Sequence, residues 1–217
     1  MSRPDTLSIN EIFYSIQGES SRMGLPCIFV RLAFCNLRCA WCDSEYTFYE
    51  GKDISLAELL DQVSEYDCRL VEVTGGEPLA QENVIPFMKA LCDRGYEVLL
   101  ETSGSLDISH VDSRVRRIVD IKCPGSGMVA RNRYKNIELL TPQDEVKFVI
   151  KDRHDYEWAK NMIGEHGLMG RCPILMSPVF GELENVHLSE WILDDGLNVR
   201  FQIQMHKYIW DPQQRGV

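Results

Sequence analysis

Short apolar runs that alternate with helix-like segments constrain the fold of this chain more than any other feature. The runs "IFVRLAF" and "VKFVI" carry apolar residues at nearly every position, which is typical of strands buried on both faces. Runs of this kind predict strands at 28–34, 70–74, 97–101, 118–122, 146–150, 174–179 and 199–204. With helices between them, they predict an α/β fold with parallel strands, either an open doubly wound sheet or a full or partial barrel.

The segments between the strands have the apolar spacing of helices. They predict helices at 55–63, 82–95, 154–167 and 186–196. Ser55 and Glu58 form a capping-box pattern at the start of the first helix, and Gly95 is a C-cap for the second. No repeat, low-complexity tract or Pro/Gly/Ser linker divides the chain. Residues 1–217 are therefore expected to form a single domain.

Charge and hydropathy narrow the classes of partner. The chain has 33 acidic and 23 basic residues, and no basic stripe of the kind that binds phosphates, so nucleic-acid binding is not expected. It lacks a run of about 18 apolar residues and an N-terminal secretory pattern, so no membrane contact is expected and the cytoplasm is the expected location. A small-molecule substrate is favoured.

Polar segments of unusual composition follow the predicted strands. They are 35–44, "TGGEP" at 74–78, "ETSG" at 101–104, "KCPGSG" at 122–127, "SPVF" at 177–180 and "QMHK" at 204–207. Ligands of parallel α/β folds bind where the carboxyl ends of the strands meet. Six such loops at one edge of the sheet predict one site.

Three cysteines, Cys35, Cys39 and Cys42, lie close together in the first of these loops. A structural zinc ion takes four protein ligands, usually as two Cys pairs, and a catalytic zinc site rarely has three thiolates. Thiolates also hold iron–sulfur clusters, and three of them on a [4Fe–4S] cluster leave one iron open for chemistry. The spacing alone does not decide between iron and zinc.

The motif's surroundings carry a family resemblance. C-x3-C-x2-C after a strand, with Trp41 before the last cysteine and "GGEP" at 75–78 after the next strand, resembles the radical S-adenosylmethionine (SAM) superfamily. The resemblance implies that the three cysteines hold a [4Fe–4S] cluster whose open iron chelates SAM. One electron from the reduced cluster would then cleave SAM to a 5′-deoxyadenosyl radical.

Further segments extend the resemblance over nearly the whole chain. "FYSIQGES", "VTGGEPL", "DIKCPGSG", "QMHK" and the terminal "RGV" are similar to the 7-carboxy-7-deazaguanine synthase family. Membership would imply an incomplete (β/α) TIM-type barrel that is homodimeric. It would also imply Mg²⁺-dependent ring contraction of 6-carboxy-5,6,7,8-tetrahydropterin, with loss of ammonia, in queuosine-type 7-deazapurine biosynthesis. A flavodoxin-like protein would supply the electron.

The resemblance also assigns residues to SAM. They are Trp41, Gly76, Glu77, Ser103, Lys122, Cys123, Pro124, Ser177, Pro178, Val179 and Phe180. Gly76 suits a close backbone approach, and Glu77 would pair with the amino group of SAM. Cys123 is not expected as a fourth cluster ligand, because a fourth thiolate would block SAM.

A second set is assigned to substrate and Mg²⁺. The substrate residues are Ile16, Gln17, Gly18, Glu19, Arg31, Thr74, His206 and Val217. Arg31 lies inside a strand, where its guanidinium needs either a structural ion pair or the substrate carboxylate. Ser44 stands where the family typically has Thr, and it keeps a hard oxygen for Mg²⁺.

Two alternatives differ from this assignment in what they require. An activase that installs a glycyl radical on a protein shares the cluster motif and would need a docking groove in place of a substrate pocket. A non-enzymatic iron–sulfur module would need a fourth cysteine ligand and would have no use for "GGEP".

Overall fold

A curved, open sheet of nine strands organises the computed structural model, which describes residues 5–217. The strand order is β3-β1-β2-β4-β5-β6-β7-β8-β9, with parallel pairing from β2 to β9 and antiparallel pairing of β1 with β2 and β3. The bounds are β1 Thr6–Ile16, β2 Pro26–Leu32, β3 Lys52–Ser55, β4 Leu70–Gly75, β5 Glu97–Thr102, β6 Arg116–Asp120, β7 Glu145–Ile150, β8 Ile174–Pro178 and β9 Arg200–Phe201. Because β3 and β9 do not pair, the sheet is an incomplete barrel, as predicted.

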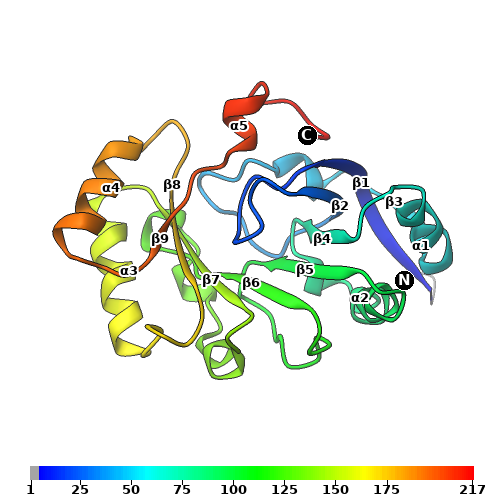
Figure 1. The fold of residues 1–217 in the computed structure, drawn as a ribbon, viewed down its shortest axis with the longest axis horizontal. Coiled ribbons are helices and arrows are strands. Elements are labelled where there is room, and N and C mark those ends of the chain that lie inside the picture. Colours follow the sequence, from blue (N-terminus) through cyan, green and yellow to red (C-terminus); the bar gives the residue numbers. More distant parts are fainter. Residues whose placement is uncertain (1–4) are drawn as a thin grey trace.

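Helices cover the outer side of this sheet (Figure 1). The bounds of these helices are α1 Leu56–Ser64, α2 Val84–Asp93, α3 Arg153–Glu165 and α4 Asn185–Asp194, whereas the short α5, His206–Ile209, lies apart from them near the C-terminus. Short 3-10 helices lie at Glu45–Phe48, Pro78–Ala80, Pro124–Ser126, Val129–Arg131 and Tyr134–Leu139. The predicted caps are confirmed: Ser55 Oγ accepts a hydrogen bond from Glu58 N at 3.2 Å, and Gly95 follows α2 with a φ of +81°.

The predicted strands are all present, with shifted ends. The strand predicted to reach Phe34 ends at Leu32, and Phe34 itself has a φ of +73°, which is incompatible with a continuing strand. The strand predicted at 118–122 spans Arg116–Asp120, and the one predicted at 199–204 retains only Arg200–Phe201. β1 and β3 were not predicted.

Alternate residues of each strand enter two different environments. On the outer face, Val71, Val146 and Phe148 join one large apolar core with residues of the helices such as Phe87 and Tyr156. The inner face has a small apolar cluster of Phe13, Cys27, Phe29, Leu70, Leu99 and Ile118, in which the rings of Phe13 and Phe29 stack at 4.8 Å. Charged residues occupy the inner positions further along the same strands. No helix of the described part of the chain is long and apolar enough to cross a membrane.

Candidate active site

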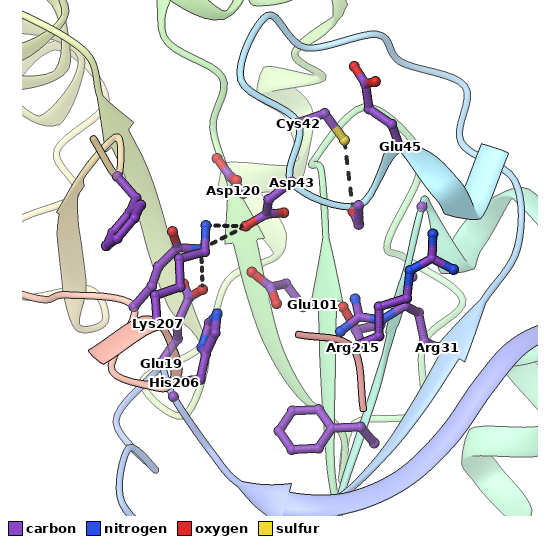
Figure 2. A pocket seen from close by; sticks show the side chains of 18 of the residues that line it. Glu19, Arg31, Cys42, Asp43, Glu45, Glu101, Asp120, His206, Lys207 and Arg215 are labelled. Atoms are coloured by element: carbon purple, nitrogen blue, oxygen red, sulfur yellow. Dashed lines mark hydrogen bonds and ion pairs between the residues drawn. The ribbon is translucent and has the colours of Figure 1, made fainter. Parts of the chain in front are cut away.

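A cavity of about 780 Å³ lies at the carboxyl ends of the parallel strands. Its wall comes from the loop after β2, the turn after β1, the inner face of the sheet and the C-terminal segment (Figure 2). The predicted residues that line it are Ile16, Gln17, Gly18, Glu19, Arg31, Cys35, Cys39, Trp41, Cys42, Ser44, Thr74, Gly76, Ser103, Lys122, Val179, Phe180, His206 and Val217. The structure therefore brings most of the predicted site together at one end of the sheet.

Five predicted SAM residues do not belong to the cavity wall. They are Glu77, Cys123, Pro124, Ser177 and Pro178. Cys123 and Ser177 are each 1% exposed, so neighbouring residues cover them. Direct SAM contact by these five residues stays a prediction.

The cysteine loop is held against the "GGEP" turn by backbone contacts. Gly76 N donates to Leu32 O at 3.1 Å, and Glu77 N donates to Phe34 O at 2.9 Å. A Cβ atom on Gly76 would lie 2.2 Å from Phe34 O and 2.8 Å from Cys35 Cβ. Glycine is therefore required here for the close approach of the chain's own loop. Gly76 also lines the cavity, and its approach to the cofactor stays a prediction.

The three thiols suit an iron–sulfur cluster better than a single metal ion. Cys35, Cys39 and Cys42 all line the cavity, and no other cysteine of residues 5–217 does. Within that range, no three His, Cys, Asp or Glu side chains converge on a point where one ion could sit. A [4Fe–4S] cluster takes each thiolate on a different iron and needs no such convergence. Burial raises the pKa of the Cys35 and Cys39 thiols, so without a cluster both favour their protonated forms. A cluster would bind them as thiolates, and its binding would release their protons.

Glu77 acts as an internal brace. Its side chain is fully buried, and its carboxylate accepts hydrogen bonds from Thr102 Oγ1 at 2.8 Å, Ser103 N at 2.7 Å and Ser103 Oγ at 2.5 Å. Leu79 N adds a fourth donor at 3.0 Å. This carboxylate joins the end of β5 to the "GGEP" turn and does not face the cavity. The predicted pairing of Glu77 with the SAM amino group stays a prediction, and in this structure the carboxylate is engaged by donors of the chain itself.

The turn after β1 is fixed from two sides. Gln17 is 2% exposed; its Nε2 donates to Glu72 Oε2, and its Oε1 accepts from Glu19 N at 3.1 Å. On the other side, Met205 N donates to Gly18 O at 3.0 Å, and a Cβ atom on Gly18 would lie 2.2 Å from His206 Nδ1. The "QGE" turn and the predicted histidine, distant in sequence, are therefore in contact.

Arg31 has both the structural partner and the free donors that the sequence suggested as alternatives. Its Nε donates to Glu11 Oε1 at 2.8 Å, and Tyr46 Oη donates to the same oxygen at 3.0 Å. Within residues 5–217, the two terminal nitrogens of the guanidinium have no hydrogen-bond partner. Glu11 thus orients the side chain through Nε and leaves its two-nitrogen edge available for a carboxylate.

The C-terminal segment is tied to the cysteine loop. Lys207 Nζ and Gln204 Nε2 donate to Asp43 Oδ2 at 2.9 and 3.0 Å (Figure 2). Arg215 stacks over the ring of Tyr46 at 3.7 Å. Burial opposes ionisation of Asp43, but the Lys207 ammonium and these hydrogen bonds hold its pKa well below the usual range. These contacts place His206 and Val217 at the cavity.

Sequence reasoning missed several charged residues of the wall. Glu72, Glu101, Asp120 and Lys147 project into the cavity from β4, β5, β6 and β7. The signal that singled out Arg31, a charged residue inside an apolar strand, applies equally to these residues and could have found them. No local signal marks Asp43 or Lys207, because each is distinguished only by its partner.

Comparisons with known proteins agree with this geometry. Residues 30–167 match the radical SAM superfamily model. The 7-carboxy-7-deazaguanine synthase of Chlorobaculum tepidum is 49% identical over 220 residues, with 100% of both chains covered. The chain belongs to the 7-carboxy-7-deazaguanine synthase family. The synthase of Koribacter versatilis is 48% identical, covering 97% of this chain and 100% of that one.

Two solved structures support the fold. QueE from Escherichia coli matches with a TM-score of 0.77 and 23% identity, covering 93% of this chain and 95% of that one. Streptococcus suis SuiB bound to S-adenosylmethionine matches with a TM-score of 0.56 and 13% identity, covering 78% of this chain and 48% of that one. At these identities the likeness concerns architecture alone.

Membership in the synthase family agrees with the donor set of the site. As a radical SAM enzyme, a 7-carboxy-7-deazaguanine synthase uses a [4Fe–4S] cluster and SAM. Three thiols at a cavity, with no fourth among residues 5–217 lining it, fit a cluster with an open iron. The full-length synthase relatives also favour the enzyme over a glycyl-radical activase or a non-enzymatic iron–sulfur module.

Proposed function

We propose that this chain converts 6-carboxy-5,6,7,8-tetrahydropterin to 7-carboxy-7-deazaguanine with loss of ammonia. The observation that carries the proposal is a single cavity in which the three cysteines, the "QGE" turn and Arg31 meet. Relatives of the same length that are named for this product support it. When bound, the cluster and SAM would supply a 5′-deoxyadenosyl radical that removes hydrogen from substrate C6.

The chain's own residues would bind, orient and enclose the substrate. The two terminal nitrogens of Arg31 match the two oxygens of the substrate carboxylate. Glu19 offers a carboxylate to donors on the pterin edge, and Val217 lies at the same cavity. The contacts of Lys207 and Gln204 with Asp43 would keep the C-terminal segment over the site and limit the entry of water.

Mg²⁺ belongs to this proposal through Ser44. Its hydroxyl oxygen lines the cavity and lies 3.8 Å from Cys42 Sγ, next to the cluster loop. A hydroxyl and a substrate carboxylate are hard oxygen ligands of the kind that Mg²⁺ takes, usually with waters. The neighbouring Asp43 carboxylate is already engaged by Lys207 and Gln204.

The remaining expectations are part of the same proposal. Residues 1–217 would act as one domain, as a homodimer in the cytoplasm, and a flavodoxin-like protein would supply the electron. A cavity of about 780 Å³ suits a small substrate together with a cofactor. The net charge of −10 supports neither a nucleic acid nor a membrane surface as partner.

An anaerobic assay of the reconstituted protein tests the function. We expect SAM, a reductant, Mg²⁺ and the carboxytetrahydropterin to yield the deazaguanine, detected by chromatography and mass spectrometry. Omission of Mg²⁺ should lower the rate. Cleavage of SAM without any deazaguanine product would refute the substrate assignment and leave the radical SAM assignment intact.

A further inference from the structure

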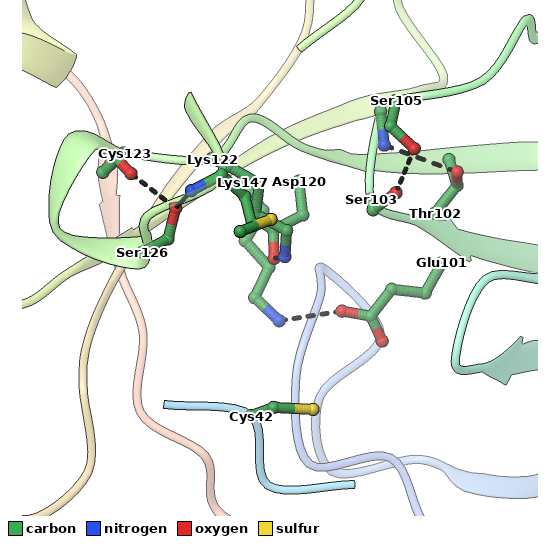
Figure 3. Close-up of polar contacts among 12 residues, drawn as sticks. Cys42, Glu101, Thr102, Ser103, Ser105, Asp120, Lys122, Cys123, Ser126 and Lys147 are labelled. Atoms are coloured by element: carbon green, nitrogen blue, oxygen red, sulfur yellow. Dashed lines mark hydrogen bonds and ion pairs between the residues drawn. The ribbon is translucent and has the colours of Figure 1, made fainter. Parts of the chain in front are cut away.

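Lys147 is the centre of a buried charge cluster on the inner face of the sheet. Its side chain comes from the middle of β7, and the residue is 5% exposed. The ammonium forms an ion pair with Glu19, from the turn after β1. It forms a second with Glu101 Oε1, from the end of β5, at 2.8 Å, which Figure 3 shows. One side chain therefore joins three elements that are separate in sequence.

The buried charge cluster around Lys147 contains more carboxylates than cationic side chains. Glu72 from β4 and Asp120 from β6 are also buried at the cavity, and Asp120 is paired with Lys122 at 2.7 Å. Among residues 5–217, Glu19 and Glu101 have ion pairs with Lys147 alone. His206 approaches from the C-terminal segment, and burial lowers its pKa, so it is a poor substitute for a fixed positive charge.

The pKa shifts of the two carboxylates Glu101 and Glu72 agree with this arrangement. Burial disfavours the charged form of Glu101, yet the Lys147 ammonium holds its pKa below the ordinary value. Glu72 lacks such a counterion, and burial together with the charge of Glu101 raises its pKa well above the ordinary value. Glu101, which contacts the ammonium, therefore favours its ionised form, whereas Glu72, which does not, favours its protonated form.

We propose that Lys147 is a positioning residue for substrate binding, because it fixes the orientation and the charge of the Glu19 and Glu101 carboxylates at the cavity wall. The identity of the substrate rests on the proposed function above. Glu101 keeps one oxygen without a hydrogen-bond partner in the described chain, and its side chain is 25% exposed toward the cavity. That oxygen is available to a donor on the ligand.

A lysine on the outside of the protein supplies a matched control. Lys160 on α3 also contacts two carboxylates, those of Glu157 and Asp195, at 3.1 and 2.9 Å. Its side chain is 32% exposed and lies away from the cavity wall. Exposed pairs contribute little to stability, so Lys160→Met should alter neither binding nor folding measurably.

Binding to the reconstituted protein separates positioning from general damage. For Lys147→Met we expect the Kd of the carboxytetrahydropterin to rise about tenfold or more, with a Kd for SAM within about twofold of the unaltered protein. Lys147→Arg, which keeps the charge, should recover part of the pterin affinity. Equal losses of affinity for SAM and pterin, or none for either, would overturn the proposal.

A second measurement does not depend on substrate identity. Without the ammonium, Glu101 would retain its proton when folded, so its pKa would exceed the unfolded value of about 4.3. Stability associated with a raised carboxyl pKa is present at low pH and is lost as pH rises through the folded pKa. Lys147→Met should therefore lose stability, relative to the unaltered protein, as pH rises from about 5 to about 8.

The double variant Lys147→Met/Glu101→Gln identifies the carboxyl involved. It should remove that pH dependence, together with the extra carboxylic-acid infrared band expected of Lys147→Met. The pterin Kd should stay raised, because Glu19 keeps its hydrogen bond from Gln204 but still lacks its ion-pair partner. If the stability of Lys147→Met depends on pH in the same way as that of the unaltered protein, the inference is contradicted. If the unaltered protein forms no deazaguanine, the proposed function fails, and the stability and infrared results still decide the role of Lys147.

Discussion

In β7, Val146 and Phe148 are fully buried in the core beneath the helices, whereas Lys147, between them, reaches the cavity. β4 repeats the pattern, with Val71 in the core and Glu72 at the cavity. Side chains of a strand alternate between its two faces, so one strand serves both purposes. The outer positions stabilise the fold by burying apolar area, and the inner positions hold charges in reach of a ligand.

Two buried ion pairs show the same contrast. Arg117 and Asp144 form a closed pair beside the core: Asp144 accepts from Arg117 Nε and Nη2 at 2.9 and 2.6 Å, and from Thr141 N at 2.7 Å. Of the two carboxylates paired with Lys147, that of Glu101 keeps an oxygen without a hydrogen-bond partner in the described chain, at the cavity. A saturated pair stabilises the structure, whereas an unsaturated pair at a cavity is suited to a ligand.

Among substitutions at the cavity, the largest effect should come from Cys35→Ala. We expect product formation and SAM cleavage to fall below detection, because the cluster loses one of three thiolates, while the fold persists. Iron content and the SAM cleavage assay measure this, with Cys92→Ala on α2 as the control that keeps full activity. Normal iron content with SAM cleavage in Cys35→Ala would disprove the assigned ligand set.

The outer side is tested by Phe148→Ala. Removal of this fully buried ring should cost about 3–5 kcal/mol of unfolding free energy, measured by urea titration. The protein that remains folded should keep the pterin affinity of the unaltered chain. A large loss of pterin affinity, with little loss of stability, would show that the two faces of β7 are not separable.

Asp144→Asn tests the closed ion pair. We expect a loss of about 2 kcal/mol at neutral pH, because charge-assisted hydrogen bonds are lost. Burial opposes ionisation of Asp144, but its hydrogen bonds with Arg117 lower its pKa, so its stabilisation is present above the unfolded value of about 3.9 and disappears as pH falls through the folded pKa. Unfolding curves between neutral and acidic pH should be flatter in the variant. An unchanged acid dependence would argue against this role.

The smallest of these effects is expected for Arg31→Lys. An ammonium keeps the charge and loses the two-nitrogen edge, so kcat/KM for the pterin should fall about tenfold, equivalent to about 1.4 kcal/mol. Steady-state kinetics measure this, with Arg114→Lys, in an exposed pair with Asp112, as the control. If Arg31→Lys matches that control, the guanidinium is a purely structural partner of Glu11.

Features that depend only on residues close together in the sequence were predictable from the sequence alone. The strand and helix pattern, the caps at Ser55 and Gly95, and the position of the cysteines after β2 were all apparent, because each depends on local periodicity or spacing. β1 escaped because it carries a bulge between Ile9 and Glu11 that interrupts its alternation. β3 is a short edge strand of four residues, which gives little pattern to detect.

The sequence by itself determined the chemistry that the cysteine loop can support. The three thiols lie in one short loop after β2, and the glycines that allow the loop's close packing follow the adjacent strand β4. Only the tertiary structure decided which charges face one another. Glu19 meets Lys147, and Asp43 meets Lys207, because the register and curvature of the sheet bring remote elements to one end. The energy of a buried charge depends on its partner, and pairing across strands is not a local property of the sequence.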